Sequence, residues 1–369
     1  MENFSACFDS LDDPRDDNAR HDLLEILVIA FATILCGGED CSDMALFGRA
    51  KEPFLRQFLR LKHGIPSHDT FSRVFRLLDP AGFEAGFLRF MERFAQTAPG
   101  VIAIDGKTLR RSFDRASGQS PLHLVSAWAT DTSLMLGQIA TDAKSNEITA
   151  VPKLLAMLSL KGMIVTADAM SCQRAISQQI VDQGGDYVLA LKSNQPALHD
   201  DVRLFLEDPA REPGEIDTTV DGGNGRIDTR TATVSTDVAW LRHAHNWPGL
   251  ACIGKIHRTR ERLGQKTEHI AYYILSKPVS AKRLNQIVRA HWAIENTLHW
   301  VLDVTMNEDW TRNRKDHGPG NIALLRRWAI NAHRIEASKG SVKGKLKRAG
   351  WDDGFLARVL HQSPKGHMR

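Results

Sequence analysis

The sequence predicts an α/β fold in which a mixed sheet forms the core, a helical region precedes it and a β-rich segment interrupts it. Residues 1–98 carry apolar residues at helical spacing, whereas from residue 101 short apolar runs alternate with turns. Residues 206–278 contain segments rich in Thr and β-branched residues, separated by Pro- and Gly-bearing turns, which is typical of strands. The 369 residues, 42% of them hydrophobic, suffice for two or three domains with cores of their own.

The N-terminal region is predicted to be all-helical. One helix is expected from Asp22 to Cys36 and another from Asp43 to Leu61. The apolar stretch from Ile26 to Gly38 is shorter than the ~20 residues of a membrane span and therefore predicts a core helix. A helix-turn-helix that presents Arg73 and Arg76 to a phosphate backbone is a minority alternative to plain helix packing.

The following segment shows three strands in succession and then two helix–strand pairs, which is the order of an RNase H-like core. The expected elements are residues 101–105, 122–131, 134–142, 145–158, 163–168, 172–185 and 186–191. Ser280 is expected to cap a long helix after the β-rich segment. The chain is thus divided into a helical region that could bind DNA (1–98), the first part of the core (99–205), a β-rich insertion (206–278), the completion of the core with a glutamate-bearing helix (279–335) and a basic C-terminal tail (336–369).

Two of the predicted core strands end in an aspartate. The run "VIAID" ends at Asp105 and "MIVTAD" ends at Asp168, and a small residue follows each. Ligands gather at the carboxyl ends of strands in such cores, and Gly106 lets a backbone or ligand approach closely. Two carboxylates at one sheet edge repel each other unless a cation lies between them. Oxygen ligands without clustered His or Cys favour Mg²⁺ or Mn²⁺.

A third acid is needed for two metal ions ~4 Å apart, an arrangement that catalyses in-line displacement at phosphorus. Glu295 lies in "HWAIENTLHW", with His291 and His299 one turn to either side. A glutamate among aromatic residues in a partly buried helix is costly unless it is paired or metal-bound, and a salt bridge to Arg289 or a histidine is an equally good interpretation. Rival third ligands are Asp303, Glu308 and Asp309.

Basic side chains near these acids are candidates for binding phosphate, although ordinary surface charge explains each of them separately. They are Lys107, Arg110, Arg111, Lys192, Arg289, His291, Arg312, Arg314 and Lys315. The formal net charge is +4, but the residues from His333 onward hold nine Lys and Arg against three Asp and Glu. Charge therefore favours a polyanionic partner locally, at the C-terminal end.

The chain is expected to be cytoplasmic. Its five cysteines are scattered and include no C-x-x-C pair, which indicates a reducing compartment and argues against a disulfide framework or a zinc site. The acidic N-terminus lacks the cationic segment of a secretory signal.

Several blocks in order resemble the H-repeat-associated insertion-sequence transposases, a DDE-type group. These blocks are "AIDGKTLRRS", "KSNEITAVPKLL", "TADAMSCQ", "DYVLALKSNQ", "GRIDTR" and "HWAIENTLHWVLDVTMNED", and the N-terminal "DPRDDNARHDLLEIL" extends the likeness over nearly the whole chain. The resemblance implies a catalytic, metal-binding triad of Asp105, Asp168 and Glu295, with Mg²⁺ as cofactor and Mn²⁺ as a substitute. It implies double-stranded DNA, both element ends and target, as partner, and a homodimer in the synaptic complex. Water would nick the DNA, and the freed 3′-hydroxyl would attack the target.

The chain departs from the pattern of the wider superfamily at several positions. In that superfamily, the helix that bears the glutamate carries a Y-x2-R-x3-E-x6-K signature. The corresponding residues of this chain are Val288, His291, Glu295 and Leu302. The missing phosphate contacts would have to come from elsewhere, for example from Arg289 and His291. Asn224 and Asp228 stand where a histidine and a glutamate are expected. Two alternatives stay open: a catalytically inactive DNA-binding remnant, and an RNase H-like nuclease without strand transfer.

Overall fold

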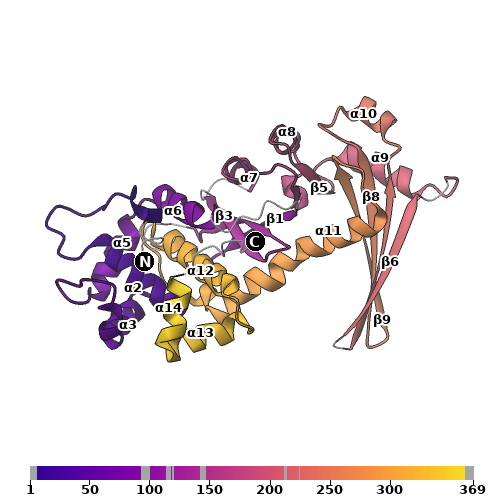
Figure 1. The fold of residues 1–369 in the computed structure, drawn as a ribbon. Coiled ribbons are helices and arrows are strands. Elements are labelled where there is room, and N and C mark those ends of the chain that lie inside the picture. The colour runs from indigo at the N-terminus through magenta and orange to yellow at the C-terminus, as the bar shows by residue number, and fades with distance from the viewer. Residues whose placement is uncertain are drawn as a thin grey trace, which may run out of the picture.

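A computed structural model describes residues 6–92, 100–113, 118, 120–141, 147–211, 214–223 and 225–361 of the chain. Within these residues, nine strands form one mixed sheet in the order β3-β2-β1-β4-β5-β9-β8-β7-β6 (Figure 1). The strands are β1 (Val101–Thr108), β2 (His123–Ala129), β3 (Leu134–Thr141), β4 (Ile164–Ala167), β5 (Asp186–Leu191), β6 (Glu215–Gly223), β7 (Arg226–Ser235), β8 (Cys252–Arg262) and β9 (Gln265–Leu275).

The first five strands confirm the predicted RNase H-like mixed sheet. β1 pairs antiparallel with β2, and β2 pairs antiparallel with β3, so the first three strands form the expected meander. β1, β4 and β5 run parallel to one another, which requires a crossover helix between each consecutive pair. These helices are α7 (Glu147–Ala156) and α8 (Arg174–Asp182).

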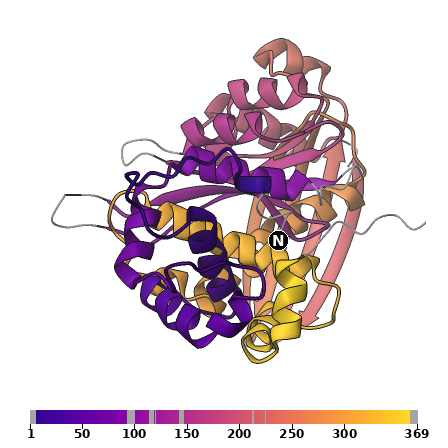
Figure 2. The ribbon, with the colours of Figure 1, turned by 60° about the vertical axis from the view of Figure 1, so that its left-hand side comes forward.

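The two faces of the sheet are covered by different helices, as Figure 2 shows. On one face, Ile102, Ile104 and Val165 pack with α7, α8 and α9 (Pro196–Glu207). On the other face, Val101 and Val188 pack against α11 (Ala281–Ile294). Ser280 caps α11 as predicted, because its hydroxyl accepts a hydrogen bond from the backbone of Arg283. α9 was not predicted as a helix.

The β-rich insertion continues the core sheet instead of forming a separate one. β6, β7, β8 and β9 pair antiparallel in sequence, and β9 then pairs with β5 of the core. A short helix, α10 (Ala239–His245), interrupts the insertion, where the sequence predicted strand-like structure. The four strands form a long ribbon at one end of the molecule (Figure 1).

The N-terminal region is helical, as predicted. It contains α2 (Leu23–Leu35), α3 (Cys41–Ala50), α4 (Glu52–Leu55), α5 (His68–Leu77) and α6 (Pro80–Glu92). α2 is a buried core helix, and no helix in the described part of the chain is both long and apolar enough to cross a membrane. The helix expected over 43–61 ends at Ala50, and the short α4 begins beside Pro53, which has no backbone N–H to continue the helical ladder.

A C-terminal helix, α12 (Gly318–Ile335), joins the N-terminal helices to the core sheet. Its Trp328 is fully buried among Phe8, Phe31 and Phe90, and its Asn331 bonds Met135 of β3. The segment predicted as a basic tail contains two further helices, α13 (Val342–Trp351) and α14 (Asp353–Leu360). Both pack on the same hydrophobic core.

Candidate active site

Asp105 and Asp168 lie side by side where the pairing of β1 with β4 ends, although β1 does not end at Asp105 as predicted but continues to Thr108 in its pairing with β2. In the parallel pairing of β1 with β4, Ile104 is the partner of Ala167, and the two aspartates directly follow these residues. Neighbouring strands are ~4.8 Å apart, so the pairing brings both carboxyl groups to one place. Asp105 Oδ1 accepts a hydrogen bond from the N–H of Gly106 at 2.9 Å, and Asp168 Oδ1 accepts from the N–H of Ser171 at 3.2 Å.

Glu295 is delivered by α11, which runs from the β insertion to the core (Figure 1). The α-helix ends at Ile294, and two π-helical turns follow, Glu295–His299 and Val301–Thr305. π-turns are rare and concentrate at functional sites. The sequence predicted one continuous α-helix here, with its glutamate partly buried. The Glu295 side chain is instead exposed, so the expected cost of burying its charge does not apply.

Several carboxylates affect the pKa of Asp105. Burial, together with the nearby carboxylates of Glu147, Glu295 and Asp168, raises the pKa of Asp105 to about 7, against the opposing effect of the hydrogen bond from Gly106. Burial and Glu147 also raise the pKa of Asp168, while the Lys192 ammonium acts in the opposite direction. The Glu295 carboxylate is therefore near enough to Asp105 to affect the pKa of that aspartate.

The donor set fits a divalent cation of the Mg²⁺ or Mn²⁺ type, because its groups are carboxylate oxygens whose mutual repulsion a cation relieves. Within the described residues, no three Asp, Glu, His or Cys side chains converge closely enough to complete a ligand set. The roles of Asp105, Asp168 and Glu295 as metal ligands therefore stay predictions.

Glu147 is a fourth carboxylate that the sequence analysis did not select. It is the first residue of α7, and its Oε1 is 2.9 Å from Nε2 of His123 in β2. A Cβ atom on Gly106 would overlap both the Glu147 carboxyl group and the His123 ring. The absent side chain at Gly106 was the available signal, since it indicates a close approach to the strand next to Asp105. The caps predicted for this helix, Ser145 or Asn146, lie outside the described residues.

Lys107 forms ion pairs with the three other candidates for the third ligand, Asp303, Glu308 and Asp309. Its Nζ lies 2.7 Å from Asp303, 3.0 Å from Asp309 and 3.6 Å from Glu308. Burial lowers the pKa of Lys107, but these carboxylates outweigh that effect and raise it above its usual value. Because its charge is neutralised and its side chain is buried, Lys107 is poorly placed to bind phosphate.

The two histidines beside Glu295 are partly buried. His291 Nδ1 is 3.0 Å from the Thr166 hydroxyl, and His299 Nδ1 is 3.6 Å from Asp105 Oδ2. Burial lowers the pKa of each histidine to about 4, so both rings are neutral near pH 7. His291 therefore carries no positive charge with which to bind phosphate.

Arg289 does not pair with Glu295 in this structure. Its Nη1 lies 2.6 Å from Asp221 of β6, so it joins α11 to the insertion. Asp228 is buried and ion-paired with Arg226, Arg258 and Arg260, which ties neighbouring strands of the ribbon together. Asn224, the other departure in this segment, lies outside the described residues.

The remaining predicted cations flank the acids from two segments. After β1, Arg110 is exposed and 3.4 Å from Asp309, and Arg111 stacks on Trp310 at 3.9 Å. Arg314 lies over Phe113 and donates to the backbone carbonyl of Arg111. Exposed cations in the same set are Lys192, Arg312 and Lys315. These side chains are available to a polyanion, and their predicted DNA contacts stay predictions.

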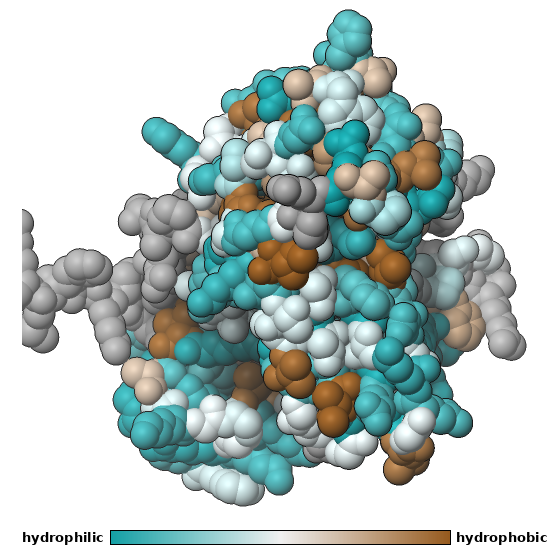
Figure 3. Space-filling model, turned by 90° about the vertical axis from the view of Figure 1, so that its right-hand side faces the viewer, coloured by the Kyte–Doolittle hydropathy of each residue, from teal (hydrophilic) through white to brown (hydrophobic). Residues whose placement is uncertain are grey.

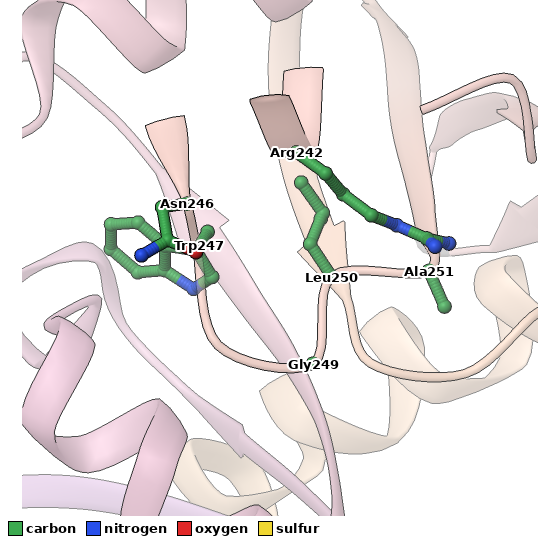
Figure 4. A pocket seen from close by; sticks show the side chains of 6 residues that line it. All are labelled: Arg242, Asn246, Trp247, Gly249, Leu250 and Ala251. Atoms are coloured by element: carbon green, nitrogen blue, oxygen red, sulfur yellow. The ribbon is translucent and has the colours of Figure 1, made fainter. Parts of the chain in front are cut away.

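Other surface features lie apart from this cluster. The face shown in Figure 3 is largely hydrophilic, with separate hydrophobic patches. A pocket beside α10 is lined by Arg242, Asn246, Trp247, Gly249, Leu250 and Ala251 (Figure 4). None of the predicted site residues lines this pocket. Trp247 is buried there and donates to the Ser177 hydroxyl, which anchors the loop to α8.

Comparisons with known proteins identify the family to which this chain is similar. The family described as "Transposase DDE domain" matches residues 96–332, and the family "DDE_Tnp_1-associated" matches residues 5–91. An uncharacterized protein of the dhlA 3′ region in Xanthobacter autotrophicus is 46% identical over 263 residues, covering 70% of this chain and 89% of that protein. The H repeat-associated putative transposase YhhI of Escherichia coli (strain K12) is 36% identical over 350 residues, covering 92% of each chain.

One solved structure with a weaker similarity is a piggyBac transposase synaptic complex with hairpin DNA. It has a TM-score of 0.41 and 12% sequence identity, over 96% of this chain and 77% of that chain.

Proposed function

The chain belongs to the transposase DDE domain family, and from that membership we propose that it is the metal-dependent transposase of an insertion sequence. It nicks DNA at the ends of its element and joins the freed strands to a target duplex. The observation that supports this most strongly is the pairing of Ile104 with Ala167, because it sets Asp105 and Asp168 next to each other where the pairing of β1 with β4 ends.

In the proposed reaction, acidic residues of the chain bind the metal ions. Asp105, Asp168 and Glu295 would hold the metal ions, which neutralise the phosphate and activate the attacking oxygen when bound. Asp105 and Asp168 are both partly buried. In the first reaction water attacks phosphorus and the bond to the 3′-oxygen breaks. In the second, the released 3′-hydroxyl attacks a target phosphodiester and displaces its 3′-oxygen.

Double-stranded DNA is the proposed partner, bound by the exposed cations near the acids. Lys192 and Arg312 are exposed, and the side chain of Arg110 is 81% exposed. A homodimer would pair the two element ends. We expect this reaction in the cytoplasm, where the bacterial chromosome is accessible.

The alternatives are a DNA-binding remnant and a nuclease that does not transfer strands. A duplex that carries a pre-cut element end with a labelled 3′-hydroxyl is incubated with a supercoiled plasmid and Mg²⁺ or Mn²⁺. A transposase joins the label to the plasmid, whereas a nuclease or a remnant does not. Asp105→Ala should abolish joining and leave retention of end-containing DNA intact, and Glu268→Gln in the distant ribbon is the matched control.

A further inference from the structure

α11 and the π-turn after it cross one face of the core sheet from β8 to β1 (Figure 1). The first half of the helix packs on hydrophobic residues of β8 and β5. Farther along, Nδ1 of His291 is 3.0 Å from the hydroxyl of Thr166 in β4. After the π-turn, Nδ1 of His299 is 3.6 Å from Oδ2 of Asp105 in β1. The segment between these two histidines therefore runs from β4 to β1.

Glu295 stands midway along this segment, four residues from each histidine. Side chains four residues apart lie on one face of a helix, about one turn from each other. The contacts of His291 and His299 show that this face is turned toward the sheet. Glu295 is therefore placed on the path between the two strands that lead to Asp168 and Asp105.

The hydrogen bond between His291 and Thr166 is the last contact of this kind before the π-turn begins at Glu295. Thr166 is 3% exposed, and its side chain shares a face of β4 with Asp168, because the backbone at Asp168 is still extended. The Thr166 hydroxyl also lies 3.4 Å from the carbonyl oxygen of Ile102. Thr166 donates either to that carbonyl, with the imidazole N–H donating to Oγ1, or to Nδ1 of the ring. Both arrangements require the hydroxyl, and neither requires a charged histidine.

We propose that His291 and Thr166 are positioning residues, and that their hydrogen bond sets the turn that bears Glu295 over the strands of the two aspartates. This inference rests on the proposed function. It replaces the phosphate contact for which the sequence made His291 a candidate. A purely structural bond would also join α11 to β4. The two roles differ in their consequences, because a structural bond affects only stability, whereas a positioning bond affects the reaction rate of the folded protein.

Thr166→Val separates the two roles, because it removes the hydroxyl and keeps the shape of the side chain. Joining of a labelled element end is measured with Mg²⁺ at saturating DNA, and the Kd for DNA is measured by fluorescence anisotropy. We expect the joining rate to fall ~10-fold or more, with an unchanged Kd for DNA and a thermal unfolding temperature lowered by only a few degrees. Thr166→Ser restores the hydroxyl and should restore the rate. Thr233→Val, at a buried threonine of β7, is the matched control and should join at the full rate.

His291→Leu removes the other partner of the bond. If the two residues act through one hydrogen bond, Thr166→Val and His291→Leu should slow joining by similar factors, and the double variant should be no slower than the slower single variant. Factors that multiply in the double variant would overturn the inference. If His291→Leu does not fold, the Thr166 variants test the inference by themselves.

Hydrogen–deuterium exchange of the protein without metal or DNA gives a readout that does not depend on joining. Backbone amides of residues 295–305 should exchange faster in Thr166→Val than in the unaltered protein or in Thr233→Val. Unchanged exchange in Thr166→Val, or an unchanged joining rate, would overturn the inference. A loss of joining that only follows a loss of DNA affinity would overturn it too, since it would assign His291 to the DNA-binding surface. If the unaltered protein does not join the element end, the proposed function fails, and the exchange measurement still tests whether the bond holds the turn.

Discussion

Nζ of Lys107 lies 2.7 Å from Oδ1 of Asp303. Lys107 itself is two positions beyond Asp105 along β1. Successive residues of a strand alternate between its faces, so Asp105 and Lys107 share a face of the sheet. Asp105 lies among acids that raise its pKa, whereas Lys107 supplies a cation to Asp303 in the π-helical segment that follows Glu295. The lysine thereby fixes the helix end that carries the third acid.

Removing the Lys107 charge should therefore destabilise the fold. Lys107→Met leaves Asp303 and the fully buried Glu308 with one cation fewer, and breaking a buried ion pair costs ~3 kcal/mol or more. Urea unfolding measures the loss, with the exposed Lys192→Met as control. Unchanged stability combined with weaker DNA binding would show that Lys107 contacts phosphate instead.

Glu308 should be equally sensitive. Burial raises its pKa, but Arg327 at 2.6 Å and Lys107 outweigh this effect and lower the pKa below its usual value. Glu308→Gln keeps the shape of the side chain but leaves Arg327 buried without a counter-charge. The free energy of unfolding should fall by ~3 kcal/mol. A loss below ~1 kcal/mol would mean that water or another group compensates Arg327.

Exposed cations should contribute to DNA binding without affecting stability. Arg312→Ala and Lys192→Ala should each weaken binding of all duplex sequences about equally and reduce the slope of log K against log salt by ~1. Fluorescence anisotropy at several salt concentrations measures both quantities. A variant with unchanged affinity and slope would remove that residue from the DNA-binding surface.

Acid should weaken the fold through His333. Burial lowers the pKa of this histidine to about 4, and its Nε2 lies 2.9 Å from the carbonyl oxygen of Leu35. The unfolded chain binds a proton near pH 6.5 and the folded chain does not until about pH 4. Stability is therefore lost as the pH falls between these values, by at most ~1.4 kcal/mol per pH unit. In thermal unfolding, His333→Gln should lose less stability over this range than the unaltered protein. Equal losses would mean that His333 is already charged in the fold.

The sequence was sufficient for the sheet and for two of its acids. Asp105 and Asp168 follow apolar runs in an order of strands that fixes their parallel pairing, so their proximity could be inferred from connectivity. The π-turns after Ile294 could not be inferred. Over five residues, the spacing of apolar side chains does not distinguish a π-helix from an α-helix. The continuity of β9 with β5 also depends on which edge strand is available in three dimensions.

The interaction partners of charged residues were harder to predict than the elements that carry these residues. Lys107 stands among basic residues beside a predicted metal ligand, Asp105, which favoured a phosphate contact, but its partners lie about 200 positions further along the chain. The sequence analysis did not select Glu147, for a different reason. It begins a predicted helix, where an acid is expected for reasons of the helix dipole alone, and only the structure shows its contact with Gly106 of β1.

The account depends on Asp105, Asp168 and Glu295 meeting around divalent metal ions. An experimental structure of the protein with Mn²⁺ and an element-end duplex, with the ions located by anomalous scattering, tests this most directly. We predict Mn²⁺ within ~2.0–2.6 Å of oxygens from all three carboxyl groups. Mn²⁺ bound elsewhere on the protein, or Glu295 directed away from the ions with no other acid in its place, would contradict it.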